Sequence, residues 1–213
     1  MSPEETRLRE AICEHGRLLF ARGFSVGSAG NISVRLAEGG VLITPTNSCL
    51  GRLDPARISR LDAEWRHVAG DRPSKEVFMH RAFLEVRPEA QAVVHLHSTH
   101  ATAIACLAQP GEAEPIPPLT PYFVMRVGGR LPVLPYFRPG DPAMGEAIAA
   151  AAREARAVLL ANHGPVVSGG SLDDAVYAAE ELEEAARLAL LLAGRDPRRL
   201  TPAQVEALLG ASG

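Results

Sequence analysis

Two histidines separated by a single residue, His95 and His97, are the side chains of this sequence best suited to bind a metal ion. They end an apolar stretch, 92–97, that has the character of a β-strand. Side chains alternate between the two faces of a strand, so residues i and i+2 point the same way. Two imidazoles on one face at a strand end can therefore converge on one ion. Taken alone, such a pair occurs about as often without a metal as with one.

His163 can supply a third imidazole, because it follows another buried strand, 157–161, and precedes a glycine in a turn. A histidine at the junction of a strand and a turn is well placed to face a cleft. Three histidines that leave one coordination position open are the pattern of a catalytic zinc site. Glu76, in the first turn of a helix expected to begin at 73–74, would then bind the metal or take up a proton.

Ordinary structural explanations exist for each of these residues. A single loop histidine is usually satisfied by neighbouring polar groups, and a glutamate at a helix start often only stabilises the helix dipole. His15 and His80 fall within expected helices and His67 within a polar loop, so none of the three is expected to be a ligand. His100 follows the expected strand, and we expect it at a helix start or behind the ligands.

A second group of short polar residues lies at the junctions of expected elements. Hydroxyls, amides and the N–H groups of a helix start are what a phosphate needs. Each pair by itself is more simply explained as a turn or a helix cap, so only the combination suggests an anion site. The pairs are Gly30-Asn31, Thr46-Asn47 and Ser74-Lys75.

The elements that must position these residues alternate between helix and strand, which predicts a single α/β layered domain over 1–213. No internal repeat or low-complexity linker divides the chain. Helices are expected at 3–22, from 73–74 to before Pro88, and at 101–107, 142–153, 172–193 and from 201–202. Strands are expected at 32–36, 41–44, 92–97, 131–134 and 157–161, with 166–167 pairing nearby and a proline-rich loop at 109–121.

The composition excludes several classes of protein. The formal net charge is −3, from 22 basic and 25 acidic side chains, and no basic run provides a footprint for nucleic acid. No apolar stretch is long enough to span a bilayer, and the first residues lack the features of a signal peptide. Cys13, Cys49 and Cys106 match neither a disulfide framework nor a zinc ribbon, so buried, reduced thiols in a cytoplasmic protein are expected.

Five segments, in this order, resemble the class II aldolase/adducin family, and the resemblance extends from about residue 5 to 207. It implies a three-layer domain with a central, largely antiparallel sheet flanked by helices. It also implies a homotetramer with active sites between subunits. The matching segments are 30–33 (GNIS), 43–46 (ITPT), 74–76 (SKE), 95–97 (HLH) and 161–164 (ANHG).

The same resemblance assigns roles to site residues. It implies one zinc ion per chain, held by His95, His97 and His163, with Glu76 alternating between the metal and the substrate as acid/base. Tyr122 matches a tyrosine that reaches across from the neighbouring subunit and assists proton transfer. The positions that match a phosphate site are Asn31, Thr46, Asn47, Ser74 and Lys75.

Two of these phosphate positions depart from the aldolase pattern. Aldolases of the family usually have glycine at the position of Asn47 and a second serine at that of Lys75. The larger amide and the cation could serve a second anion, a substrate carboxylate. Arg126 and Arg138 are further cations available for an anionic end, and the sequence does not place either one in the site.

Within the family, segments 44–51, 53–55, 95–100 and 135–141 are similar to the branch that decarboxylates 3-oxo-tetronate 4-phosphate. This similarity implies a metal-dependent carbon–carbon lyase that releases CO2 and forms dihydroxyacetone phosphate through a metal-stabilised enediolate. A sugar-phosphate aldolase of the fuculose 1-phosphate type passes through the same enediolate and is the first alternative. A pentulose-phosphate 4-epimerase is the second. A non-catalytic adducin-like module is the third, and the complete ligand set argues against it.

Overall fold

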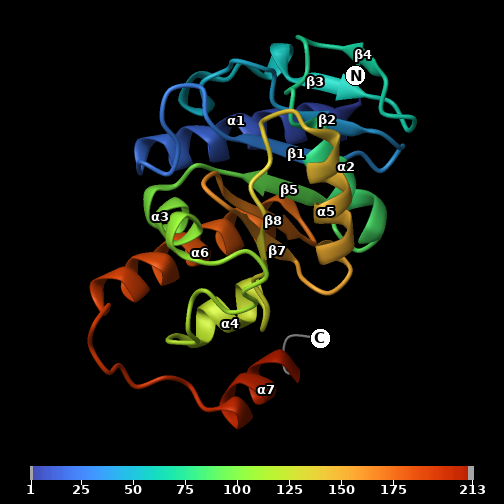
Figure 1. The fold of residues 1–213 in the computed structure, drawn as a ribbon. Helices are drawn as coiled ribbons and strands as arrows, with labels where there is room; N and C mark the ends of the chain where they lie inside the picture. Colours follow the sequence, from blue (N-terminus) through green and yellow to red (C-terminus); the bar gives the residue numbers. More distant parts are fainter. Residues whose placement is uncertain (1, 211–213) are drawn as a thin grey trace.

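The structure, a computed structural model, describes residues 2–210 and is built around one eight-stranded sheet (Figure 1). The strand order is β4-β3-β2-β1-β5-β8-β7-β6, and every neighbouring pair is antiparallel except β6 and β7. The strands are β1 (Asn31–Arg35), β2 (Val41–Ile43), β3 (Ser59–Leu61), β4 (His67–Ala69), β5 (Ala92–His95), β6 (Val133–Leu134), β7 (Ala157–Leu160) and β8 (Gly164–Gly169).

Helices cover the strands in the described part of the chain. They are α1 (Pro3–Ala21), α2 (Val77–Val86), α3 (Thr99–Leu107), α4 (Pro121–Val127), α5 (Pro142–Ala152), α6 (Leu172–Leu191) and α7 (Pro202–Gly210), with short 3-10 turns η1 (Leu50–Arg52) and η2 (Pro55–Arg57). The expected single α/β domain with a largely antiparallel sheet is therefore confirmed.

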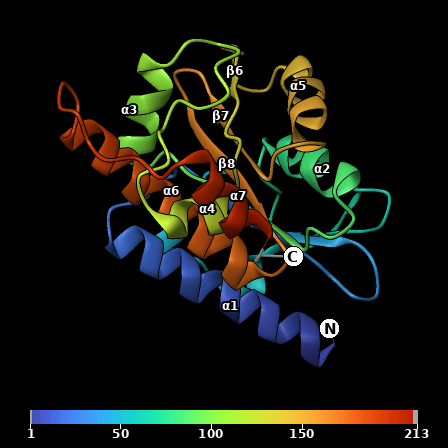
Figure 2. The same ribbon diagram turned by 90° about the horizontal axis from the view of Figure 1, so that it is seen from below.

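The two faces of the sheet bury different side chains. Along β1, Ile32 and Val34 point into the larger apolar cluster, which also takes side chains from α1, α3 and α6. Asn31 and Ser33 point to the opposite face, where α2 and α5 pack. Seen from below, α2 and α5 lie on one side of β7 and β8, and α3 and α6 lie on the other (Figure 2). The alternation of apolar and polar residues along β1 thus leaves two polar side chains under α2.

The start of α2 differs from the expectation that a helix begins at residues 73–74. The helix begins at Val77, and Glu76 occupies the N-cap position. Residues 73 and 74 remain extended because Pro73 forms an isolated bridge with Pro45, and the Ser74 N–H donates to the Thr44 carbonyl at 3.2 Å. This pairing holds the segment before Glu76 against the segment after β2.

The expected strand 92–97 is also shorter, since β5 ends at His95 and His97 lies beyond it. Helix α4 was not expected, and only its first residue falls within the expected proline-rich loop at 109–121. Its first residue, Pro121, stands where a missing N–H costs nothing, and the Thr120 hydroxyl accepts from the Phe123 N–H at 3.4 Å. Strands β3 and β4 were not expected, because they are three residues each and β4 is exposed.

Among residues 2–210, no helix is both long enough and apolar enough to cross a membrane. The expected burial of the cysteines is wrong, because Cys13 and Cys49 are only half-buried and Cys106, on α3, is exposed.

Candidate metal centre

His95 and His97 bring their Nε2 atoms together at the end of β5. The His95 side chain is fully buried, and its Nδ1–H donates to the Pro165 carbonyl on β8 at 2.8 Å. That bond fixes the tautomer, so the lone pair of His95 is on Nε2. The Nε2 atoms of His95 and His97 are 3.0 Å apart. Although β5 ends at His95, the two imidazoles face the same point.

His163 reaches this point from the turn between β7 and β8. The turn is possible because Asn162 adopts a left-handed backbone conformation with φ 57°, which asparagine tolerates well. The Asn162 N–H donates to the Ala105 carbonyl at 3.1 Å and ties the turn to α3. The three imidazole rings lie 4.8–4.9 Å apart between centroids, and the ligand nitrogens of His95, His97 and His163 all lie within 4.8 Å of one another.

Two glycines allow the backbone to close around the imidazoles. A Cβ on Gly30 would lie 2.9 Å from the His95 carbonyl oxygen, and one on Gly164 would lie 2.4 Å from the Leu96 carbonyl oxygen. Real Cβ atoms do not approach oxygen so closely. Both glycines also have positive φ, at 81° and 153°, which disfavours larger residues. The segments before β1 and at the start of β8 therefore press directly on the backbone that carries the ligands.

Glu76 directs its carboxylate at the imidazoles from the start of α2. Its Oε1 is 3.4 Å from His163 Nε2 and its Oε2 is 3.7 Å from His95 Nε2. The side-chain amide of Asn31 donates to Oε2 at 2.7 Å. Among the described residues, the cluster that could hold a metal ion consists of the three histidines, and this carboxylate lies beside it.

The electrostatics of the cluster favour unprotonated His95 and His97 beside an ionised Glu76. Burial lowers the pKa of His95 to about 3, although the Glu76 charge acts in the opposite direction. Burial also lowers the pKa of His97. For Glu76, burial alone would raise the pKa, but the hydrogen bond with His163, the nearby His95 and the Asn31 amide together hold it below its usual range. Neutral imidazoles and a carboxylate are the forms that bind divalent cations.

A polar pocket of about 280 Å³ opens next to Glu76. The loop after β2 and the loop before α2 form two of its walls, and they are joined by the bond from the Thr46 N–H to the Arg72 carbonyl at 2.9 Å. Asn47 has a positive φ of 55° in this wall. All five residues with phosphate-site positions in the sequence line it, namely Asn31, Thr46, Asn47, Ser74 and Lys75.

The remaining candidates lie in different surroundings. Tyr122 is on α4 with its side chain 62% exposed. Arg126 pairs with Asp174 at 3.3 Å and lies over the ring of Tyr177, whereas Arg138 is exposed and directly precedes two residues that line the polar pocket. His100 is in the first turn of α3, and its Nδ1 is 2.7 Å from Oε1 of Glu183.

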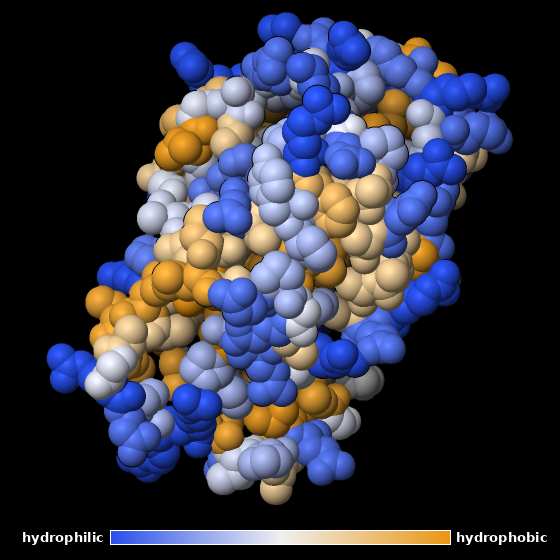
Figure 3. Space-filling view, viewed as in Figure 1, coloured by the Kyte–Doolittle hydropathy of each residue, from blue (hydrophilic) through white to orange (hydrophobic). Residues whose placement is uncertain are grey.

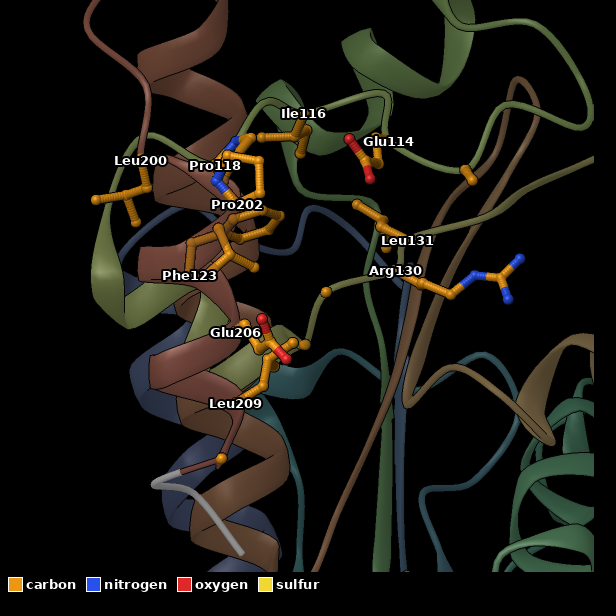
Figure 4. Close-up of a pocket in the computed structure, with 15 residues that line it drawn as sticks. Glu114, Ile116, Pro118, Phe123, Arg130, Leu131, Leu200, Pro202, Glu206 and Leu209 are labelled. Atoms are coloured by element: carbon orange, nitrogen blue, oxygen red, sulfur yellow. The ribbon is translucent and has the colours of Figure 1, made fainter.

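A larger cavity of about 470 Å³ lies elsewhere, between α7, α4 and the loop before α4 (Figure 4). Apolar side chains such as Phe123, Leu131 and Leu209 dominate its wall, with Glu114 and Arg130 at its margin. It contains none of the three histidines, so size does not identify the chemical site here. The convergence of the three histidine nitrogens identifies the chemical site instead.

The sequence did not reveal that His80 and Ser33 lie behind the side chains that contact Glu76. His80 is fully buried and bridges Ser33 and Asn31, which lie on β1. Two spacings carry a signal that could have revealed this group. Residues 31 and 33 share one face of a strand, and residues 76 and 80 share one face of a helix.

Comparisons with known proteins agree with this geometry. A protein from Escherichia coli strain K12 named 3-oxo-tetronate 4-phosphate decarboxylase is 47% identical over 204 residues, covering 96% of each chain. L-fuculose phosphate aldolase from Haemophilus influenzae is 34% identical over 192 residues, 88% of this chain and 85% of the aldolase. The crystal structure of YgbL from Klebsiella pneumoniae, whose name leaves its activity open between aldolase, epimerase and decarboxylase, has a TM-score of 0.92 at 48% identity and covers 96% of this chain and 98% of that one.

Residues 10–190 match the family described as Class II Aldolase and Adducin N-terminal domain. This match spans most of the chain, and the resemblance found in the sequence is confirmed. The chain belongs to the class II aldolase and adducin family.

Proposed function

We propose that this chain is a zinc-dependent carbon–carbon lyase that converts 3-oxo-tetronate 4-phosphate into dihydroxyacetone phosphate and CO2. The observation that carries the proposal is the convergence of three imidazole nitrogens beside an ionised carboxylate, Glu76, which also lines a polar pocket. The name and 47% identity of the Escherichia coli relative favour decarboxylation over aldol cleavage. The fuculose phosphate aldolase, at 34%, is the more distant of the two.

The donor set fits a divalent cation. His95 has its Nδ1–H committed to a carbonyl, so its buried Nε2 presents a lone pair toward His97 and His163. A divalent cation among the three rings would bind this lone pair and one from each of the other two imidazoles. Imidazole nitrogens with an open position favour zinc, one ion per chain. When bound, the ion would supply Lewis acidity at the oxygens next to the bond that breaks.

Glu76 is suited to move the proton. Loss of CO2 breaks the bond between the carboxyl carbon and the adjacent carbon, and leaves an electron pair on the latter. That carbon must then gain a proton. Glu76 lies beside the histidines and is ionised in the free site, so it can take a proton from water and pass it to the carbon. In this proposal it also serves as an intermittent metal ligand.

The polar pocket would hold the phosphate. Its wall offers the hydroxyls of Thr46 and Ser74, the amides of Asn31 and Asn47 and the ammonium group of Lys75. Phosphate binding by such groups anchors the substrate in the ground state and in the transition state alike. The carboxylate that leaves gains nothing from tight binding, so we assign it only orientation, by Lys75 in this wall and Arg138 in the loop beside it.

We further propose a homotetramer in which Tyr122 enters the site of a neighbouring subunit. The tyrosine is largely exposed, and so are the apolar side chains Leu107 and Leu191. Apolar surface gathers over the region of α3 and the far end of α6 (Figure 3). Exposed apolar patches of this kind favour protein–protein contact. In the proposed arrangement, the site is incomplete in one chain alone.

The proposal also covers three general features of the protein, which are its domain organisation, its layered architecture and its cellular location. Residues 1–213 form one domain. Helices pack on both faces of the sheet, which supports the three-layer arrangement implied by the family. The expected cytoplasmic location remains a prediction.

Substrate selection tests the proposed reaction. We expect purified protein with zinc to release CO2 and dihydroxyacetone phosphate from 3-oxo-tetronate 4-phosphate. We expect little aldehyde from fuculose 1-phosphate or ribulose 1-phosphate. Product analysis by coupled assay for each substrate distinguishes the reactions. Rapid aldehyde release without CO2 would replace the decarboxylase with an aldolase.

Replacement of one ligand tests the metal site. His97→Ala removes one of three nitrogen donors, so we expect about one zinc per chain in the wild type and a small fraction of that in the variant. Elemental analysis after dialysis measures both. His67→Ala, which changes an exposed histidine on β4, is the matched control and should keep its zinc. Wild-type protein that neither contains nor takes up a divalent ion would contradict the metal site.

Replacement of the carboxylate tests the acid/base. Glu76→Gln keeps the size of the side chain but removes its capacity to take a proton, so we expect a fall in kcat on the order of a hundredfold or more with zinc retained. Steady-state kinetics and metal content are measured together. Glu85→Gln, which changes an exposed glutamate on the same helix, should behave as the wild type. Full turnover by Glu76→Gln would transfer the role to Tyr122 or to water.

A further inference from the structure

His80 is buried beneath the metal centre, and its hydrogen bonds go to Ser33 and Asn31 and not to the three histidines. Its side chain is completely inaccessible to solvent, and it lies one helical turn after Glu76 on the same face of α2. Its Nδ1 is 2.7 Å from the Ser33 hydroxyl, and its Nε2 is 2.5 Å from Oδ1 of Asn31. Asn31 in turn donates from Nδ2 to Oε2 of Glu76 at 2.7 Å. Four side chains thus form one continuous chain of hydrogen bonds.

The direction of this chain follows from the charge at its end. An ionised Glu76 can only accept, so Asn31 must turn its NH2 group toward the carboxylate. The carbonyl oxygen of the same amide then faces His80, and this oxygen can only accept. His80 must therefore carry its proton on Nε2, which leaves Nδ1 to accept from the Ser33 hydroxyl. Reversal of any one member would place two acceptors against each other.

Burial supports the neutral imidazole that this arrangement requires. Desolvation lowers the pKa of His80 to about 4, although the charge of Glu76 acts in the opposite direction. A neutral imidazole has one donor and one acceptor, and both are used here. The carboxamide of asparagine has no intrinsic preference between its two orientations. A buried donor that contacts the amide oxygen, as His80 does in Asn31, can fix one of the two orientations.

We propose that His80 is a positioning residue that acts through Asn31: it holds the amide in the one orientation that donates to Glu76, and so keeps the carboxylate aimed at the three histidines. The proposal rests on the proposed function in one respect, namely that Glu76 moves the proton. The side chains themselves are positioned by backbone pairing, because Asn31 lies opposite His95 in the β1–β5 ladder. The same strand pair therefore aligns a metal ligand and the support of the carboxylate.

This arrangement also explains how Asn31 can have two roles. One N–H and the carbonyl oxygen are committed to Glu76 and His80, and the second N–H remains available to the polar pocket that Asn31 lines. A ligand anion in that pocket and the acid/base carboxylate would then share one rigid amide. Loss of His80 should disturb the carboxylate more than it weakens substrate binding.

The tautomer of His80 tests the proposal without any substrate. Histidine labelled with ¹⁵N gives separate solid-state NMR signals for protonated and unprotonated ring nitrogens, and His80→Gln identifies the His80 signals by their loss. We expect Nε2 protonated and Nδ1 unprotonated in the wild-type protein. Protonation on Nδ1 instead would mean that Asn31 presents its oxygen to Glu76, and the proposal would be wrong. This result does not depend on which reaction the protein catalyses.

Kinetics of a double-mutant cycle test the route through Asn31. His80→Leu removes the donor, and we expect kcat to fall about 10–100-fold with a smaller change in KM, as when a hydrogen-bonding partner behind an active-site group is lost. His80→Gln can still donate to Asn31 from its amide and should recover most of kcat. In the Asn31→Ala background, His80→Leu should lower kcat less than about twofold further, because the route is already broken.

A packing control separates positioning from general loss of structure. Phe83→Leu changes another fully buried side chain of α2, and it should lower the melting temperature while kcat stays close to the wild-type value. An equal loss of kcat for His80→Leu with and without Asn31 would overturn the proposal. If the wild type releases no CO2, the decarboxylase assignment fails, and the double-mutant cycle is then measured with whichever sugar phosphate the protein cleaves. The positioning role of His80 fails only if the cycle shows no coupling to Asn31, so the two failures give different results.

Discussion

The convergence of three imidazoles and one carboxylate on one point is the constraint on which the rest of this structure depends. The pairing of β5 with β8 aims the buried Nε2 of His95 at His97 and His163, and the carboxylate of Glu76 approaches from the start of α2. Without a cation, these groups have little reason to remain together, because each would be better solvated by water. The backbone therefore has to hold them. Four segments do so: β5, the residues that follow it, the turn before β8 and the start of α2. They meet because the sheet places β1, β5 and β8 side by side.

Close backbone approach is the means by which these segments meet. Gly30 and Gly164 stand where a side chain would collide with the strand that carries the ligands. Asn162 accepts a left-handed conformation so that the turn can present His163. These residues have no part in the proposed chemistry itself. They set the distances on which that chemistry depends, since a ligand displaced by an ångström contributes little to a four-coordinate ion.

The identity of the histidines could be predicted from the sequence because their spacing follows the period of a strand, and because the turn after 157–161 has a distinctive composition. The residue at which α2 begins could not be predicted in this way. Helix capping rules place it at residues 73–74, but the pairing of Pro73 with Pro45 keeps that segment extended. This is a tertiary effect that overrides a local preference.

The hydrogen-bonded support of Glu76 could not be predicted either. Ser33 and His80 are far apart in the sequence, and their contact depends on which face of β1 receives α2. Neither residue has a motif of its own. The residues of the pocket beside Glu76 were easier to predict from the sequence, because each wall begins with small polar residues at a junction between elements. Local composition thus indicates the groups that we propose to meet a ligand, whereas the groups that hold them in place emerge only from the fold.

The most direct test of the three-histidine metal centre is X-ray absorption at the zinc edge of the loaded protein. Three imidazoles on one ion predict nitrogen scatterers at about 2.0–2.1 Å, with the outer-shell pattern of imidazole rings and oxygen completing the coordination. The pattern should be reduced in His97→Ala. A first shell that contains sulfur at about 2.3 Å, or one without imidazole features, would place the ion elsewhere and contradict the proposed metal centre.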